Sequence, residues 1–190
     1  AKQAGEFDDA YVVYAHGGHV FPHPMPEGYN GTTRPWFKET AAAGKPIVTA
    51  PYVDASTGKL TITFAEPVSE SGSLVAVVGT DMHLDSVTRK VNGIRATNKS
   101  FAFLLDDAGN ILAYANAELV LKPATAIAPA LTTSLMAGLA QSGGHTEVDV
   151  SGATQLVYAA RVEGTPWMLG IAVDKADAQA SLRELLQLEV

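Results

Sequence analysis

The sequence predicts an α+β fold of two tandem modules, each an antiparallel sheet with flanking helices. Each half of the 190-residue chain contains two hairpin signals, in which a polar or glycine-bearing turn separates apolar, β-rich runs. A helical segment lies between the two hairpins of each half. The second half repeats the first after about 90 residues, a period that indicates tandem globular modules and not a solenoid.

The first module is expected to contain two hairpins separated by one helix. The helix is predicted at residues 35–43, because Pro35 suits the first helical turn and Gly44 is a stop signal. The apolar runs on either side indicate strands with tight connections. The predicted strand pairs are residues 9–15 with 20–21, and residues 60–67 with 74–81.

The second module is expected to repeat this order, with its helix at residues 128–139. Residues 85–98 are interpreted as the connection between modules, and residues 175–190 as an amphipathic helix that leaves the second one. Both closing strands end in an aspartate, so Asp81 and Asp174 are interpreted as counterparts. The predicted strand pairs are residues 100–105 with 111–114, and residues 155–158 with 167–174. The apolar side of the exit helix carries Leu182, Leu185 and Leu186.

Composition excludes several functional classes. The formal net charge of -7 and the pI near 5.1 argue against a nucleic-acid partner, because no basic field would attract phosphates. The chain has no cysteine, which excludes a disulfide framework and a thiolate metal site. No secretory leader opens the sequence, and no apolar run reaches the roughly 18 residues of a membrane span.

A candidate ligand-binding site lies in the first module, where one cation accompanies two acids and several aromatic residues. A guanidinium can hold a carboxylate through two parallel hydrogen bonds, whereas carboxylates and a phenol suit an ammonium group. This combination predicts a site for a small zwitterion. The six candidate residues are Tyr29, Arg34, Trp36, Tyr52, Asp54 and Asp81.

These residues lie in four short stretches that resemble double Cache domains, the extracytoplasmic sensor regions of bacterial chemoreceptors and of some sensor kinases and cyclases. The resemblance covers nearly the whole chain and implies a pair of PAS-like modules. It extends to the subgroup that binds amino acids. The four stretches are Pro26-Glu27-Gly28-Tyr29, Arg34-Pro35-Trp36-Phe37, Pro51-Tyr52-Val53-Asp54 and Val78-Gly79-Thr80-Asp81.

The resemblance implies a role for each candidate residue. Arg34 and Trp36 match the pair that binds the ligand carboxylate, and Tyr52 matches a further aromatic position of the pocket. Phe37 departs from the pattern, since tyrosine is common after the tryptophan, and this removes a hydroxyl near the site. The residues that match the ammonium-binding group are Tyr29, Asp54 and Asp81.

The resemblance also implies an organisation beyond the site. It implies a membrane-distal, ligand-binding module at residues 1–96 and a membrane-proximal module with the exit helix at residues 97–190. A long N-terminal helix and a membrane span are expected before Ala1, and a second span after Val190. The full-length protein is then expected to be a homodimeric chemoreceptor of the inner membrane, with this domain in the periplasm and without a cofactor.

Each site residue also has a purely structural interpretation. Trp36 can be a core anchor, and Asp54 can form a turn with the Ala-Ser-Thr-Gly stretch that follows it. Asp81 can cap the next helix, as Asp174 is expected to do in the second module. These interpretations do not explain why all six residues match one pattern together.

Other functions receive less support from the sequence. A metal site of His16, His19 and His23 is disfavoured, because a hairpin turn separates them and no cysteine or nearby acid completes the set. No hydrolase motif or phosphate-binding loop occurs, so the chain is not expected to be an enzyme. Two alternatives stay open. The same fold can sense a biogenic amine, a polyamine or a quaternary amine, or the domain can be an interaction module without a ligand.

Overall fold

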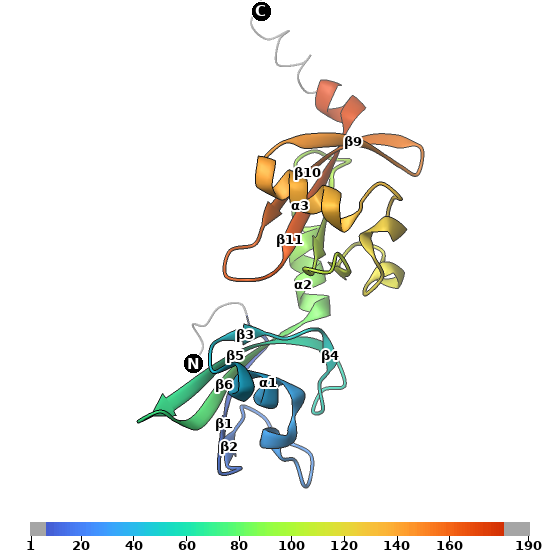
Figure 1. Cartoon of the computed structure of the whole chain (residues 1–190). Coiled ribbons are helices and arrows are strands. Elements are labelled where there is room, and N and C mark those ends of the chain that lie inside the picture. The colour runs from blue at the N-terminus through green and yellow to red at the C-terminus, as the bar shows by residue number, and fades with distance from the viewer. Residues whose placement is uncertain (1–6, 181–190) are drawn as a thin grey trace, which may run out of the picture. The chain divides into compact units, whose positions relative to one another are not determined.

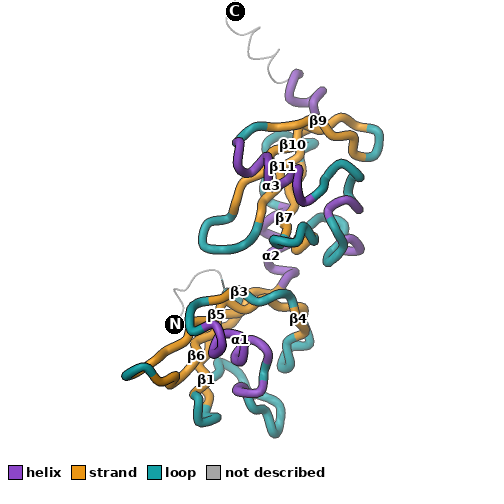
Figure 2. The backbone as a smooth tube through the Cα atoms, in the orientation of Figure 1, coloured by secondary structure: helices purple, strands orange, loops and turns teal. Residues whose placement is uncertain are grey.

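The computed structural model describes residues 7–180 and confirms the predicted α+β fold. The chain divides into two compact units between Ser86 and Val87. Each unit contains one antiparallel sheet with helices beside it (Figure 1). Figure 2 shows the strands of both sheets in orange and the helices in purple. Within residues 7–180, no helix has the length and apolar character required to cross a bilayer.

The first unit has a six-stranded sheet, in which the long hairpin β5–β6 lies at the centre. The strand order is β2-β1-β6-β5-β3, and β4 also pairs with β5. Both predicted hairpins are present, and two short strands, β3 and β4, were not predicted. The strands are β1 (Asp9–Tyr14), β2 (His19–Val20), β3 (Ile47–Val48), β4 (Tyr52–Val53), β5 (Leu60–Glu70) and β6 (Ser73–His83).

Helix α1 (Pro35–Ala43) forms where the sequence predicts it. Pro35 occupies the first helical turn, and Gly44 adopts the left-handed conformation with φ 59° while its N–H donates to the Thr40 carbonyl. A short 3₁₀ turn, η1 (Gly31–Thr33), precedes the helix. The helix packs its aromatic side on one face of the sheet. The buried cluster between them consists of Tyr11, Val13, Trp36, Phe37, Ala65 and Val77.

Helix α2 (Leu84–Asn92) follows β6 directly and occupies the first part of the segment interpreted as the connection between modules. The sheet of the second unit has the order β8-β7-β11-β10-β9, the same arrangement as in the first unit. Its core lies between this sheet and helix α3 (Thr133–Ser142). The other elements are β7 (Phe101–Leu105), β8 (Ile111–Ala113), η2 (Ala117–Leu119), η3 (Ala124–Ala126), β9 (His145–Val150), β10 (Ala153–Arg161) and β11 (Met168–Asp174).

The prediction of a helix at residues 128–139 is wrong at both ends. Pro129 disfavours a helical conformation at the residue before it. Thr132 supplies the cap instead, because its Oγ1 accepts from the Leu135 N–H at 3.2 Å. The helix ends at Gly143, which is left-handed with φ 68°. The segment that follows forms β9, an edge strand that was not predicted.

An aromatic–glycine pair lies at the same place in both sheets. Tyr11 is the register partner of Gly79, and Phe103 is the partner of Gly170. A Cβ atom at either glycine would overlap the facing ring, so each glycine makes room for the aromatic side chain. These pairs give the structural alignment of the two units.

This alignment corrects one sequence-based interpretation. Asp81 lies two residues after Gly79, and the residue two after Gly170 is Ala172. The counterpart of Asp81 is therefore Ala172 and not Asp174. Asp174 caps the next helix, as predicted, because its Oδ1 accepts from the Asp177 N–H at 2.8 Å.

The predicted exit helix is described only in part. Residues 175–180 are helical and follow β11 directly. The remainder of the predicted helix, including Leu182, Leu185 and Leu186, lies outside the described residues.

Candidate functional site

The candidate site lies at one end of the first sheet, on the face that α1 covers. Asp9 pairs with Asp81 across β1 and β6, and Asp81 pairs with Thr63 across β6 and β5. Directly opposite residues of antiparallel strands point to the same face. These three polar side chains therefore form one row across the sheet.

Asp81 lies inside β6 and does not end it, so the interpretation of Asp81 as a helix cap is wrong. The strand continues to His83, whose imidazole Nδ1 lies 2.9 Å from Thr61 Oγ1. Asp8 holds the end of the strand. Its Oδ2 accepts from the His83 N–H at 2.8 Å, and its Oδ1 accepts from Ser86 Oγ at 2.9 Å.

Asp81 is buried, with 4% of its surface exposed. Its Oδ1 accepts hydrogen bonds from the Tyr11 hydroxyl at 2.8 Å and from Thr63 Oγ1 at 2.6 Å. The single Thr63 hydroxyl proton is thus used, so Tyr52 donates to Thr63 Oγ1 at 2.6 Å. No group in the described part of the chain donates to Asp81 Oδ2, which leaves this oxygen available to a ligand.

Burial raises the pKa of Asp81 to about 6, although hydrogen bonds from Thr63 and Tyr11 act in the opposite direction. The negative charges of Asp54 and Asp9 raise this pKa further. Burial and the Asp81 charge also raise the pKa values of the Tyr11 and Tyr52 phenols. Both phenols therefore remain protonated and act as hydrogen-bond donors.

Asp54 forms the predicted turn with the residues that follow it. Its Oδ2 accepts from the backbone N–H and the hydroxyl of both Ser56 and Thr57, at 2.6–3.1 Å. Burial raises the pKa of Asp54, but these hydrogen bonds more than offset it and the pKa is lowered. The carboxylate is thus ionised, and its Oδ1 receives no hydrogen bond from residues 7–180.

Arg34 occupies the position that precedes the first turn of α1. Its backbone is fixed, because its N–H donates to the Gly31 carbonyl at 3.1 Å and its carbonyl accepts from Lys38 at 3.1 Å. Arg34 is partly buried, and its guanidinium forms no ion pair with any residue that the structure describes. A guanidinium without an ion-pair partner is suited to a carboxylate ligand.

Trp36 is buried at 3% exposure, and its ring packs edge-on against Tyr11 with centroids 5.2 Å apart. The predicted core role of Trp36 is therefore present. Burial raises the pKa of Tyr29, whereas the Arg34 charge and a hydrogen bond with Trp36 lower it. Asp54 and Asp81 also raise this pKa, so Tyr29 lies within electrostatic range of both acids and of the cation. The six predicted residues thus lie together in space.

Three residues that shape this site were not among the six. Tyr11 and Thr63 hold Asp81, and Phe21 stacks on Tyr11 with ring centroids 4.5 Å apart. Phe21 also contacts the edge of Tyr29 at 5.5 Å, which extends the aromatic wall. Asp9 and Tyr11 lie two positions apart on one predicted strand and so face the same side. This pattern could have identified Tyr11 from the sequence.

The three histidines considered as a metal site do not converge. His16 stacks on Tyr14 at 5.4 Å, and His19 contacts the edge of Tyr29 at 5.6 Å. His23 Nε2 lies 3.2 Å from Asp9 Oδ2. Among residues 7–180, no group of three or more histidine, cysteine or acidic side chains is arranged to hold a metal ion.

The equivalent place in the second unit is apolar. Phe103 replaces Tyr11, Ala172 replaces Asp81, and the register partner of Ala172 is Val157 in place of Thr63. All three side chains are fully buried at 0% exposure. The second unit therefore has a packed core where the first has the polar row.

Comparisons with known proteins agree with the fold. The sequence model of the Cache domain matches residues 1–182. The chemotaxis protein McpG of Pseudomonas putida is 35% identical over 161 residues, which cover 83% of this chain and 24% of that protein. The chain thus spans about a quarter of the length of such curated relatives.

Solved structures are similar over most of the chain. The ligand-binding domain of the Pseudomonas fluorescens chemoreceptor CtaA, in complex with L-isoleucine, has a TM-score of 0.73 and 29% identity, covering 94% of this chain and 73% of that one. The domain of Pseudomonas aeruginosa PctB, in complex with L-Arg, has a TM-score of 0.71 and 26% identity, covering 92% and 74%. The chain belongs to the Cache domain family, with the fold of bacterial chemoreceptor ligand-binding domains.

Proposed function

We propose that this chain is the extracytoplasmic sensor domain of a membrane-anchored, homodimeric chemoreceptor and that its first unit binds an L-amino acid. The observation that supports this most directly is the juxtaposition of the unpaired Arg34 guanidinium with two carboxylates that each keep one oxygen available. The ligand carboxylate would bind Arg34, next to Trp36. The ligand ammonium would bind Asp54 Oδ1 and Asp81 Oδ2.

The charges of the site explain why a zwitterion is favoured. Burial of either charge of an amino acid is costly unless that charge is paired and hydrogen-bonded. The site offers a partner to both. A simple carboxylate would leave Asp54 and Asp81 without a cation between them, and a simple amine would leave Arg34 unpaired. The bound amino acids of the similar solved domains support the same ligand class.

The role within a whole receptor is also part of this proposal. Relatives of this chain are methyl-accepting chemotaxis proteins, and this chain corresponds to about a quarter of their length. Signal output and membrane insertion would therefore depend on other parts of the receptor.

A ligand panel tests the proposal. Differential scanning fluorimetry with L-amino acids and with amines is expected to give stabilisation by at least one amino acid, followed by calorimetry for its Kd. Arg34→Ala is expected to weaken binding by about 10- to 100-fold, because a charge-assisted bond contributes about 1.5–3 kcal/mol. Lys38→Ala, an exposed position on the same helix, is the control. Stabilisation by amines alone, or unchanged amino-acid affinity in Arg34→Ala, contradicts the proposal.

The affinity is also expected to depend on pH. Asp81 must be ionised to hold an ammonium, and burial raises its pKa to about 6 in the free protein. Affinity should therefore be constant above this pH and fall below it, by about tenfold between pH 7.5 and pH 5. Calorimetry at the two pH values measures this change. The dependence should persist in His23→Gln, and a Kd that does not change with pH would argue against Asp81 as the ammonium partner.

A further inference from the structure

A cavity of about 120 Å³ lies between the start of α1 and the segment that connects β3 to β4. Its walls are Pro35, Trp36 and Glu39 from the helix, residues 49–51 from the connecting segment and Tyr52 at the start of β4. About 10–15 Å³ is enough to hold one water molecule. The cavity can therefore accommodate a side chain of several non-hydrogen atoms.

The cavity adjoins the candidate site. Trp36 and Tyr52 belong to both, and Pro35 directly follows Arg34. Thr49 is bonded twice to the strand that carries Thr63, because its N–H donates to the Thr63 carbonyl and its Oγ1 accepts from the Thr63 N–H, each at 3.0 Å. A ligand whose two charges lie at Arg34 and at the aspartates would therefore have this cavity next to it.

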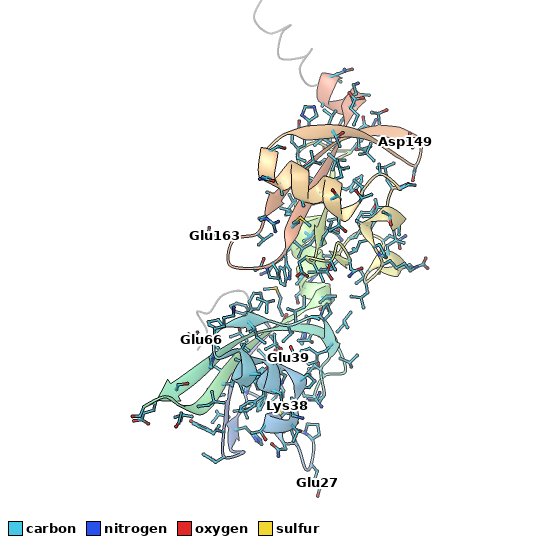
Figure 3. The ribbon with its side chains drawn as sticks, in the orientation of Figure 1. Glu27, Lys38, Glu39, Glu66, Asp149 and Glu163 are labelled. Carbon is cyan, nitrogen blue, oxygen red and sulfur yellow. The ribbon has the colours of Figure 1, made fainter. Side chains whose placement is uncertain are left out.

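Glu39 is the single charged side chain in the cavity wall among the described residues. It lies three positions after Trp36, so the two side chains share one side of α1, where Figure 3 labels Glu39. No residue in the range 7–180 forms an ion pair with it. The wall is otherwise aromatic, aliphatic or hydroxylic, which suits an aliphatic stem with a cationic end.

The charges around the site also favour a cationic ligand. Asp9, Asp54 and Asp81 lie close enough that the first two raise the pKa of the third, and Glu39 adds a fourth acid. Arg34 is the cation whose charge acts on Tyr29 beside these acids, and His23, where protonated, pairs with Asp9. The acids that line the site and the cavity outnumber the one guanidinium among them, and this favours a ligand with a net positive charge.

We propose that the ligands of this site are L-amino acids with a long cationic side chain, such as L-arginine, L-lysine or L-ornithine. The aliphatic stem occupies the cavity between Trp36 and residues 49–52, and Glu39 holds the terminal cation. This inference rests on the proposed amino-acid function and specifies its ligand class.

Filling the cavity is the first test. Ala50 is exposed and lines the cavity, so Ala50→Phe should fold normally and occupy the space. The Kd for L-arginine and L-lysine is expected to rise at least tenfold. The Kd for glycine or L-alanine should change by less than twofold. Ala42→Phe, exposed on α1 outside the cavity, is the matched control. An equal loss for small and large ligands would overturn the assignment of the cavity.

Removing the charge is the second test. Glu39→Gln is expected to weaken binding of L-arginine and L-lysine about fivefold, a modest effect because the ion pair is partly solvated. L-norleucine, with the same stem but no cation, should bind wild type and variant equally. Glu66→Gln removes one exposed charge from the same unit without touching the cavity and should change nothing.

The outcomes separate this inference from the proposed function. Preference of the wild-type domain for neutral or acidic amino acids over cationic ones would overturn the inference and leave the amino-acid function standing. Failure of every amino acid to bind would overturn both.

Discussion

Replacement of Asp81 by asparagine should weaken binding of an L-amino acid at least about a hundredfold. An ammonium buried at this place would lose a fully charged partner, and an uncompensated buried charge costs about 3–5 kcal/mol. Calorimetry on wild type and variant measures the loss. Asp107→Asn is the control, because it removes the same charge from an exposed position in the second unit.

The same substitution should leave the fold intact. An asparagine oxygen can accept the hydrogen bonds that Tyr11 and Thr63 donate to Asp81. The pKa of Asp81 in the folded protein, about 6, lies above the unfolded value of about 3.9, so ionisation of this group opposes folding at neutral pH. The melting temperature of Asp81→Asn without ligand, at pH 7.5, is therefore expected to equal or exceed that of wild type. A lower melting temperature would indicate that Asp81 has a structural role instead.

An aspartate introduced at the equivalent place in the second unit should lower the stability of that unit. Ala172 is fully buried beside Phe103 and Val157, neither of which can donate a hydrogen bond. Ala172→Asp should therefore destabilise the second unit by about 3–5 kcal/mol, which lowers its melting temperature by at least about 10 °C. Thermal and urea unfolding, followed by circular dichroism, measure this loss.

Two further variants test the explanation. Thr154→Asp introduces the same charge at an exposed position of β10 and should be nearly neutral. The triple variant Phe103→Tyr, Val157→Thr and Ala172→Asp supplies the two donors that the first unit uses, and should recover part of the lost stability. A triple variant less stable than Ala172→Asp alone would show that the donors do not satisfy the new carboxylate.

The sequence predicted those features that depend on local signals. Helix α1 begins at Pro35 and ends before Gly44 because both residues act on their own backbone. The hairpins were found from turn residues between apolar runs. The six candidate site residues were selected from short stretches of sequence, and their role as ligand contacts stays a prediction. Asp54 was expected to form a turn, and its contacts with Ser56 and Thr57 are the contacts of that turn.

The features that the sequence did not predict depend on pairing between distant strands. Tyr11 and Thr63 reach Asp81 from residues 70 and 18 positions away, and no local pattern gives that register. The same limit produced the wrong counterpart for Asp81. Two strands that each end near an aspartate look equivalent in sequence, whereas the pairing of Phe103 with Gly170 places Ala172 at the equivalent position.

The uninterrupted course of β6 into α2 has a consequence for how a ligand would be reported to the rest of a receptor. Only Met82 and His83 separate Asp81 from the first residue of α2, a path of about 10 Å along an extended strand. Strand β6 is hydrogen-bonded to neighbouring strands on both sides, and the Asp8 carboxylate accepts a hydrogen bond from the N–H of its last residue, His83. Such a strand resists bending and stretching, so a shift of Asp81 would move the start of the helix with little loss. Ligand binding in the first unit would then move the start of α2 without a hinge between the site and the helix.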